Sequence, residues 1–399
     1  MLANLDRLAR RMDELGLDGL VATTAENVYY LTGIASVGLE IFPHSGQCYA
    51  VVTRNRLAHP HFVATRCDLD QALDAAVGLD GAIGYGTFFR EPPDGAPLTA
   101  REERLRTLWD GGPAPATPLD ALVETLRRAG LETARIAVDE DGVPPFGFFD
   151  GLREALPAAD VRTAAGLLRG VRKVKTPAET ARVAAAAAVA EQAMLATAAI
   201  AKPGVTERDL VREFERTVAG AGGRPKFTCI KIGAAGVAGQ SYPGSEKLRP
   251  GDHIWFDVGC VVDGYWSDIA RVFSLGEPGP KVARYYDAMR AGVERAIAEA
   301  RPGMTGKELF DITMEAVRES GVPHYRRNHT GHGIGVEIYD QVLIAPDNGH
   351  VIEEGTVVNI ETPYYEFGFG AVQVEDPFVV RAEGNEVLTT LGRELTVLK

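Results

Sequence analysis

The spacing of apolar residues changes from helical to strand-like several times in the first part of the chain. Four apolar side chains recur at intervals of three or four residues, as on one face of a helix: Leu5, Leu8, Met12 and Leu15. Gly16 then ends the predicted helix. The apolar runs LDGLVAT (17–23) and RIAVD (135–139) predict buried strands. We therefore predict an α/β domain, with the Pro- and Gly-rich segment 90–120 as a surface excursion.

Two alanine-rich stretches, 178–201 and 281–300, predict long helices in the second part of the chain. Each is followed by a similar nonapeptide, KPGVTERDL (202–210) and RPGMTGKEL (301–309). In both copies a threonine precedes an acidic residue by three positions, which is the pattern of a capping box at the start of another helix. A predicted hairpin follows each copy. The repeat predicts an α+β domain with pseudo-twofold symmetry and a site between its halves.

The charged stretch GLLRGVRKVKTPAETARV (166–183) predicts the passage between these two domains. Thr176 has the features of a helix N-cap, Pro177 would occupy the first helical position, and Glu179 would complete a capping box. We place the domains at 1–167 and 168–399. A chain of 399 residues exceeds the usual size of a single hydrophobic core, which agrees with two domains.

Two aspartates flank a predicted hairpin in FDVGCVVDGYWSDIARVF. The Asp-Gly dipeptide at 263–264 favours a tight turn, and the runs beside it are rich in aromatic and β-branched residues. A turn there would place Asp257 opposite Ala270, two positions along from Asp268. Both aspartates would then point to the same face, roughly 7–8 Å apart at the backbone. The alternative is a pair of solvated strand acids.

Two glutamates repeat this arrangement in NIETPYYEFGFGAVQVEDP. Glu361 and Glu375 are equally distant from Gly368, so a hairpin centred on that glycine would place them face to face. Two like charges directly opposite each other destabilise a sheet unless a cation or a shared proton offsets them. Two such hairpins in one chain therefore favour a cation site over coincidence.

A histidine between glycines, His332 in HTGHGIG, completes the set. A single histidine is more often structural, but glycines on both sides would let backbone and substrate approach closely. The sequence has no HExxH and no CxxC, which disfavours mononuclear zincin and zinc-ribbon sites. We predict that five residues bind a pair of divalent cations of the Mn, Co, Fe or Zn type: Asp257, Asp268, His332, Glu361 and Glu375.

Composition narrows the class of protein. The hydrophobic fraction is 45% without a long uncharged apolar run, so we expect a globular protein with no membrane span. The first residues lack the apolar core of a secretory signal. The net charge of −13 argues against nucleic acid as a partner. Four scattered cysteines indicate a reducing compartment, and we expect a cytoplasmic protein: Cys48, Cys67, Cys229 and Cys260.

The same motifs carry a resemblance to a known family. DxG…GYxSDxxR, GHGIG, ExP and VED match the pita-bread metallohydrolases (methionine aminopeptidase, aminopeptidase P, prolidase and the related creatinase) at all five ligand positions. The stretch RLARRMDELGLDGLVATTAENVYYLTGIAS (7–36) resembles the N-terminal domain of the creatinase–prolidase branch. The resemblance implies a creatinase-like α/β domain followed by an α+β pita-bread domain. It also implies a homodimer in which the N-terminal domain of one subunit closes over the site of the other.

A reaction follows from the ligands and the resemblance together. Asp268 and Glu375 would bridge two ions, Asp257 would complete one ion site, and His332 with Glu361 would complete the other. Ions held this way would activate a shared water and polarise the scissile carbonyl. By resemblance, Glu361 also handles the proton of the attacking water. We expect hydrolysis of an amide or imide C–N bond, as in Xaa-Pro dipeptidase and aminopeptidase P.

Around these ligands the chain departs from the peptidases that it resembles. It has Tyr339 where they carry a histidine after GHGIG, and Ser241 or a neighbour where they carry one before the first aspartate hairpin. Their arginine two positions before the last glutamate is Gln373 here. We assign all three to substrate binding, and Tyr339 could also donate a hydrogen bond to an oxyanion. His329 as a catalytic residue and Arg327 as a substrate-binding residue could supply further donors, or both could be solvated loop residues.

Three functions remain open on the sequence alone. The first is a dinuclear hydrolase of the prolidase and aminopeptidase P type that cleaves an Xaa-Pro or similar imide bond. The second is a non-peptidase on the same scaffold, acting on a small carboxylated metabolite by C–N hydrolysis of the creatinase or ectoine-hydrolase kind. The third is a binding module built on an inactive peptidase domain, which would have no chemical need for five retained ligands.

Overall fold

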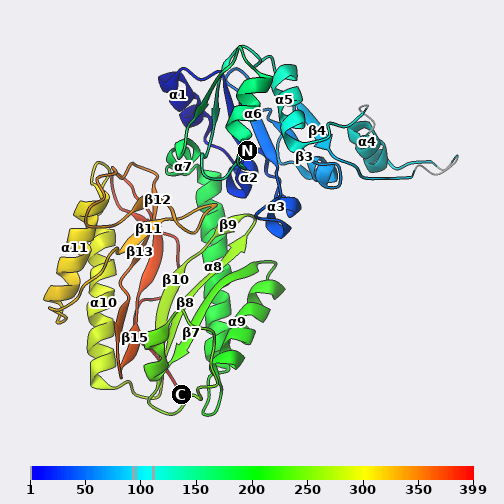
Figure 1. Ribbon diagram of the computed structural model, residues 1–399. Coiled ribbons are helices and arrows are strands. Elements are labelled where there is room, and N and C mark those ends of the chain that lie inside the picture. Colours follow the sequence, from blue (N-terminus) through cyan, green and yellow to red (C-terminus); the bar gives the residue numbers. More distant parts are fainter. Residues whose placement is uncertain (1, 92–94, 96, 110–112) are drawn as a thin grey trace. The chain divides into compact units, whose positions relative to one another are not determined.

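Two compact units make up the chain, Met1–Val171 and Arg172–Lys399. The structure is a computed structural model that describes residues 2–91, 95, 97–109 and 113–399 (Figure 1). The predicted domain limits, 1–167 and 168–399, place the change of domain slightly earlier, inside α7 (Leu167–Arg172). Among the described residues, every helix is too short or too polar to cross a lipid bilayer.

The first unit is an α/β domain, as its sequence pattern predicts. Its six-stranded sheet has the order β4-β3-β2-β1-β5-β6. The strands are β1 (Gly19–Ala22), β2 (Tyr49–Thr53), β3 (His61–Thr65), β4 (Gly81–Tyr85), β5 (Arg135–Val138) and β6 (Asp160–Thr163). The helices are α1 (Leu5–Leu15), α2 (Ala25–Thr32), α3 (Val37–Ile41), α4 (Ala100–Trp109), α5 (Pro118–Arg128) and α6 (Phe148–Ala155).

Two details of this unit differ from the sequence analysis. Leu8 and Met12 of α1 are buried, but Leu15 is 46% exposed, because it lies in the last turn before Gly16 adopts the left-handed conformation. The predicted excursion at 90–120 is not irregular throughout, since α4 lies within it and α5 begins in it. Residues 92–94, 96 and 110–112 of that segment lie outside the described residues.

The second unit is an α+β domain around a ten-stranded sheet of order β12-β11-β13-β16-β10-β8-β7, with three short strands at its sides. The main strands are β7 (Arg224–Ile232), β8 (His253–Val262), β10 (Ile269–Leu275), β11 (Gly331–Gly333), β12 (Asp340–Leu343), β13 (Val357–Glu361) and β16 (Glu375–Val379). The short strands are β9 (Tyr265–Trp266), β17 (Glu386–Val387) and β18 (Thr396–Leu398). A small hairpin pairs β14 (Tyr364–Glu366) with β15 (Gly370–Val372).

The predicted repeat is visible in the helices of this unit. The first pair is α8 (Pro177–Ala199) and α9 (Glu207–Gly220), and the second is α10 (Pro280–Glu299) and α11 (Gly306–Glu319). Thr206 caps α9 and Thr305 caps α11, and both capping boxes are complete, which confirms the prediction from the repeated nonapeptide. The two pairs flank the sheet in Figure 1.

Two hydrophobic cores hold these layers together. Phe256 and Phe273 of the sheet pack at 5.3 Å in the core that includes α8 and α9. Val358, Ile360 and Phe378 belong to the core that includes α10 and α11. Each half of the sheet therefore buries one face against its own helix pair, which leaves the opposite face available for polar side chains.

Candidate metal centre

Three of the predicted carboxylates lie in a single row across the large sheet. The register pairs Asp257 with Ala270, Ala270 with Glu375, and Glu375 with Glu361, across β8, β10, β16 and β13. Residues directly opposite each other in antiparallel strands point to the same face. Ala270, the one small member of the row, leaves space between the acids. This register confirms the hairpin geometry inferred from the Asp-Gly turn and from Gly368.

Asp268 and His332 reach the same face from outside this row. Asp268 lies between β9 and β10, two positions before Ala270, and His332 lies opposite Asn359 in β11. One ligand atom each from Asp268, His332 and Glu375 lies within 4.8 Å of the others. Oδ2 of Asp268 is 3.7 Å from Nε2 of His332. All five predicted ligands are buried, with exposures of 7% or less.

The glycines around His332 allow three strands to meet closely. A Cβ atom on Gly333 would lie 1.9 Å from the carbonyl oxygen of Gln341, and one on Gly331 would lie 2.3 Å from that of Asn359. Nδ1 of His332 donates to the carbonyl oxygen of Gly333 at 3.0 Å, because a carbonyl can only accept. Nε2 therefore carries the free lone pair, and it faces Asp268.

Three of the four acids have raised pKa values, because they are buried and few positively charged side chains lie near them. Burial, followed by the charge of Glu361, raises the pKa of Asp257 to about 8. Burial and the neighbouring carboxylates also hold the pKa values of Asp268 and Glu375 well above their usual range. Burial lowers the pKa of His332, so its imidazole is neutral and able to act as a ligand.

Glu361 differs from the other three acids because its partner is a histidine at the edge of the cluster. Nε2 of His329 is 2.8 Å from Oε1 of Glu361. Burial opposes ionisation of Glu361, but the contact with His329 and the nearby charge of Arg327 favour it, and the pKa of this carboxyl is lowered. Glu361 is thus the acid of the cluster that most readily stays ionised.

Neutral side chains orient the remaining glutamate. Nδ2 of Asn359 donates to Oε1 of Glu375 at 2.6 Å, and Nε2 of Gln373 donates to Oε2 at 2.9 Å. The indole N–H of Trp255 can only donate, and it lies 3.1 Å from Oε1 of Gln373. The amide of Gln373 is therefore fixed with its NH₂ group toward the acids, including Oε2 of Glu361 at 3.5 Å.

Tyr339 and His329 lie together at the edge of this cluster. The ring of Tyr339 stacks on His332 with centroids 3.8 Å apart and planes 19° apart. Its hydroxyl is 3.2 Å from Nε2 of His329. Burial and the charge of Glu361 raise the pKa of Tyr339, so the hydroxyl keeps its proton. Half of the surface of this residue is exposed.

Arg327 and Ser241 are placed differently. The guanidinium of Arg327 lies 5.9 Å from the ring centre of Tyr365, and its Nε is buried without a hydrogen-bond partner among the described residues. Its charge lowers the pKa values of Asp257 and Glu361, although burial raises that of Asp257 overall. Ser241 instead accepts a hydrogen bond from Nζ of Lys231 at 2.9 Å. Arg327 therefore lies near Asp257 and Glu361, whereas the hydroxyl of Ser241 is hydrogen-bonded to Lys231.

The donor set fits divalent cations. Oδ1 of Asp268 is buried and has no hydrogen-bond partner among the described residues, whereas buried carboxylate oxygens are normally paired or bound to a metal. Carboxylate oxygens and one imidazole nitrogen suit Mn, Fe, Co or Zn. Asp257, Asp268, His332, Glu361 and Glu375 are the residues that could hold such ions.

The sequence analysis missed Asn359 and Trp255. A signal for Asn359 was present, because it lies two positions before Glu361 and must share its face. Trp255 is likewise two positions before Asp257. Alternation could have placed both on the metal face, but only the strand order shows that they reach Glu375 and Gln373.

Comparison with known proteins agrees with this geometry. Residues 181–382 match metallopeptidase family M24, and residues 4–174 match the creatinase/prolidase N-terminal domain. The Xaa-Pro dipeptidase of Lactobacillus delbrueckii subsp. lactis is 28% identical over 310 residues, which cover 76% of this chain and 84% of that protein.

Two solved structures share the fold over 99% of both chains. The Xaa-Pro dipeptidase from Bacillus anthracis superposes with a TM-score of 0.77 at 24% identity. The X-Pro aminopeptidase from Thermotoga maritima superposes with a TM-score of 0.78 at 22% identity. The chain therefore belongs to metallopeptidase family M24, a family of metal-dependent hydrolases, and carries the creatinase/prolidase N-terminal domain ahead of its catalytic domain.

Proposed function

We propose that this protein is a dinuclear metal-dependent hydrolase of the Xaa-Pro dipeptidase type, which cleaves the imide bond before proline in short peptides. The observation that carries the proposal is the set of four carboxylates and one neutral imidazole on one face of the large sheet. The similarity to the Xaa-Pro dipeptidase of Lactobacillus delbrueckii subsp. lactis supports the substrate class.

Two ions would share the five ligands in this proposal. Asp268 and Glu375 would be common to both ion sites, Asp257 would complete one, and His332 with Glu361 would complete the other. Bound Mn, Co, Fe or Zn ions would activate a water molecule and act as Lewis acids toward the scissile carbonyl. The separate hydrogen bonds to the two oxygens of Glu375 support its role as a ligand, because they hold the carboxylate plane in one orientation.

The protein's own residues manage the proton and the developing charge. Glu361 accepts the proton of the attacking water, and the contact with Nε2 of His329 at 2.8 Å holds the carboxylate in place for that transfer. The hydroxyl of Tyr339 donates to the oxygen of the scissile carbonyl as negative charge develops there. The stack on His332 supports this role, since it fixes the tyrosine ring beside a metal ligand.

Arg327, Gln373 and Ser241 are the proposed substrate contacts. The unpaired Nε of Arg327 and its position near the acids support binding of a substrate carboxylate. Gln373 contributes a neutral amide where the peptidases that the chain resembles carry an arginine. The hydrogen bond from Lys231 leaves Ser241 as the least supported of the three.

A second candidate function rests on the positions at which this chain differs from the peptidases that it resembles. Tyr339, Ser241 and Gln373 replace two histidines and an arginine around an intact ligand set, which favours a substrate other than ordinary peptides. The alternative is C–N hydrolysis of a small carboxylated metabolite on the same scaffold, in the manner of creatinase or ectoine hydrolase.

We also propose that the protein acts as a homodimer in the cytoplasm. The dimer rests on the family resemblance alone. All four cysteines are free, which agrees with a reducing compartment.

Hydrolysis of a panel of Xaa-Pro dipeptides and tripeptides tests the proposal, after the purified protein is loaded with Mn or Co. We expect metal-dependent turnover that an Asp268→Asn variant lacks. Two bound ions without turnover on any peptide would contradict the peptidase assignment and favour the small-metabolite alternative. Failure to bind any metal would contradict both.

A further inference from the structure

The reverse face of the sheet carries a second charge cluster directly behind the metal row. Side chains alternate along a strand, so Arg271 and Asp376, which follow Ala270 and Glu375, point away from the acids. Nη2 of Arg271 donates to Oδ1 of Asp376 at 2.7 Å, and both residues are almost completely buried. This carboxylate is paired with an arginine, whereas none of the acids in front forms an ion pair with a lysine or arginine among the described residues.

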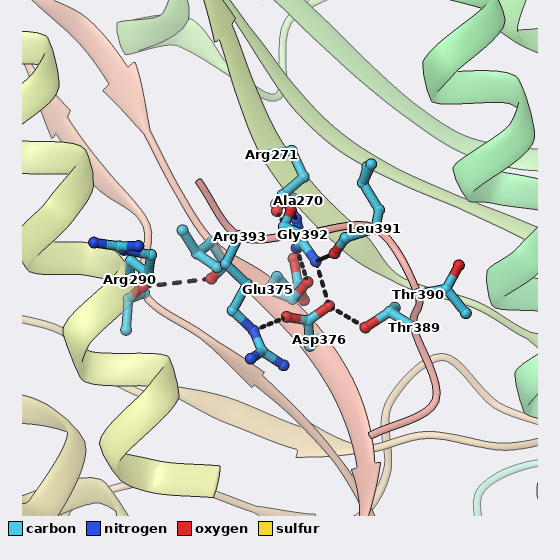
Figure 2. Close-up of polar contacts among 12 residues, drawn as sticks. Ala270, Arg271, Arg290, Glu375, Asp376, Thr389, Thr390, Leu391, Gly392 and Arg393 are labelled. Carbon is cyan, nitrogen blue, oxygen red and sulfur yellow. Dashed lines mark hydrogen bonds and ion pairs between the residues drawn. The ribbon is translucent and has the colours of Figure 1, made fainter. Parts of the chain in front are cut away.

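All five N–H donors of Arg271 are occupied, and Figure 2 shows the residues around them. Besides the bond to Asp376, Nη1 donates to the carbonyl oxygens of Ala270 and Glu375, each at 2.9 Å. The remaining donors reach the carbonyl oxygens of Leu391 at 2.9 Å and Gly392 at 3.0 Å. A lysine has only three donors and could not replace this set.

The last two acceptors of Arg271 belong to a C-terminal strap, residues 386–398. The strap begins with β17, which pairs with β16, and ends with β18, which pairs with β10. In between, Glu191 of α8 accepts hydrogen bonds from the backbone N–H groups of Thr390 and Leu391. The strap therefore connects the two halves of the sheet behind the metal row.

The strands that the strap connects have little contact of their own. A single register pair, Ala270 with Glu375, joins β10 to β16 among the described residues, whereas six pairs join β10 to β8. We call this boundary between β10 and β16 the seam. Asp257 and Asp268 lie on the β10 side of it, and Glu361 and Glu375 lie on the β16 side. The sheet ladder alone gives the seam little rigidity at the point where the ligands of both halves must meet.

We propose that Arg271 is a positioning residue that sets the distance between the ligands of the two halves, by linking the carbonyl of Glu375, the carboxylate of Asp376 and the C-terminal strap. This inference rests on the proposed dinuclear site. Removing one donor from the link would let β16 shift relative to β10, and Glu375 would move away from Asp268. Metal affinity and coordination geometry would change, although no ligand is altered.

Titration of the metal-free, full-length protein with Co²⁺, followed by visible absorption, tests the inference without any substrate. We expect Arg271→Lys to weaken Co²⁺ binding by about 10–100-fold, as is typical when a group behind a metal ligand is changed. The absorption bands should also shift, because they report the coordination geometry. Unchanged affinity and bands in a folded Arg271→Lys variant would overturn the inference.

Arg393→Lys is the matched control. Arg393 contacts the other oxygen of the same Asp376, and it forms no hydrogen bond with Glu375 among the described residues. A lysine can still form that ion pair, so we expect a change below about threefold. Equal weakening in both variants would mean general loosening and would also overturn the inference. If Arg271→Lys does not fold, Glu191→Ala frees the backbone N–H groups of Thr390 and Leu391 and loosens the strap that carries two acceptors of Arg271. A band shift in that variant supports the inference, and unchanged bands overturn it.

Discussion

Glu375 and Asp376 are neighbours in the sequence, yet they lie in opposite electrostatic environments. Glu375 points to the front of the sheet among three other carboxylates, and its hydrogen-bond donors are the neutral amides of Asn359 and Gln373. Asp376 points to the back and is paired with Arg271 and Arg393. A buried acid that the fold needs is neutralised by the protein itself, whereas acids that await a cation are left without one.

The largest expected effect comes from Glu375→Gln. The substitution removes a proposed bridging ligand, and we expect kcat/KM to fall on the order of 10⁴-fold, as for other members of a catalytic unit. The metal-free variant should be at least as stable as the parent, because one of four mutually repelling acids is gone. Initial rates on Xaa-Pro peptides and metal-free thermal unfolding measure both. A destabilised metal-free variant would mean that Glu375 is structural.

The opposite pattern is expected for Asp376→Asn. Two buried or half-buried arginines would lose their counter-charge, which should lower the free energy of unfolding by about 3 kcal/mol. Denaturant unfolding of the metal-free protein measures this change. An unchanged free energy of unfolding would contradict the proposed difference between Asp376 on the back of the sheet and Glu375 on the front.

The pH dependence of stability sharpens the comparison further. The folded-state pKa of Asp257 is raised to about 8 by burial and by Glu361, whereas an unfolded aspartate titrates near 3.9. Between these values the folded chain holds a proton that the unfolded chain has lost, so stability falls as the pH rises. For each such carboxyl the slope is at most about 1.4 kcal/mol per pH unit.

Calorimetry of the metal-free protein at about pH 5 to pH 8 measures this slope, because that range lies between the unfolded and folded pKa values of Asp257. Saturating Mn or Co should abolish it, since a bound cation replaces the protons. A melting temperature that rises with pH in the metal-free protein would contradict the account of the front face.

The smallest effect is expected at the edge of the front face. Tyr339→Phe keeps the stack on His332 but removes the hydroxyl, and we expect kcat to fall about tenfold, the value of one hydrogen bond to developing charge, with little change in KM. Steady-state kinetics on a single Xaa-Pro substrate separates the two constants. A change confined to KM would assign Tyr339 to ground-state binding.

The sequence was most informative where the chain pairs with itself nearby. Both hairpin registers followed from short-range signals, an Asp-Gly turn and the symmetry about Gly368, and each placed a pair of acids correctly. The capping boxes at Thr206 and Thr305 were equally local. The exposure of Leu15 was not predicted. Helical spacing shows which face of a helix is apolar, but it does not show how far along the helix the rest of the domain covers that face.

Contacts between distant strands could not be derived in the same way. Alternation assigns Arg271 and Asp376 to the reverse face, but nothing in the sequence states that β10 lies beside β16. The five acceptors of Arg271 come from three separate stretches of chain, and four of them are backbone carbonyls that no residue type identifies. The same limit applies to Trp255 and Gln373.

Because a single register pair joins β10 to β16 among the described residues, the two halves of the second unit meet in the way that two subunits of a heterodimer do. Each half of the repeat brings its own helix pair, its own hydrophobic core and its own two carboxylates. Neither half holds a complete ligand set, so the chemistry belongs to their association and to neither partner alone.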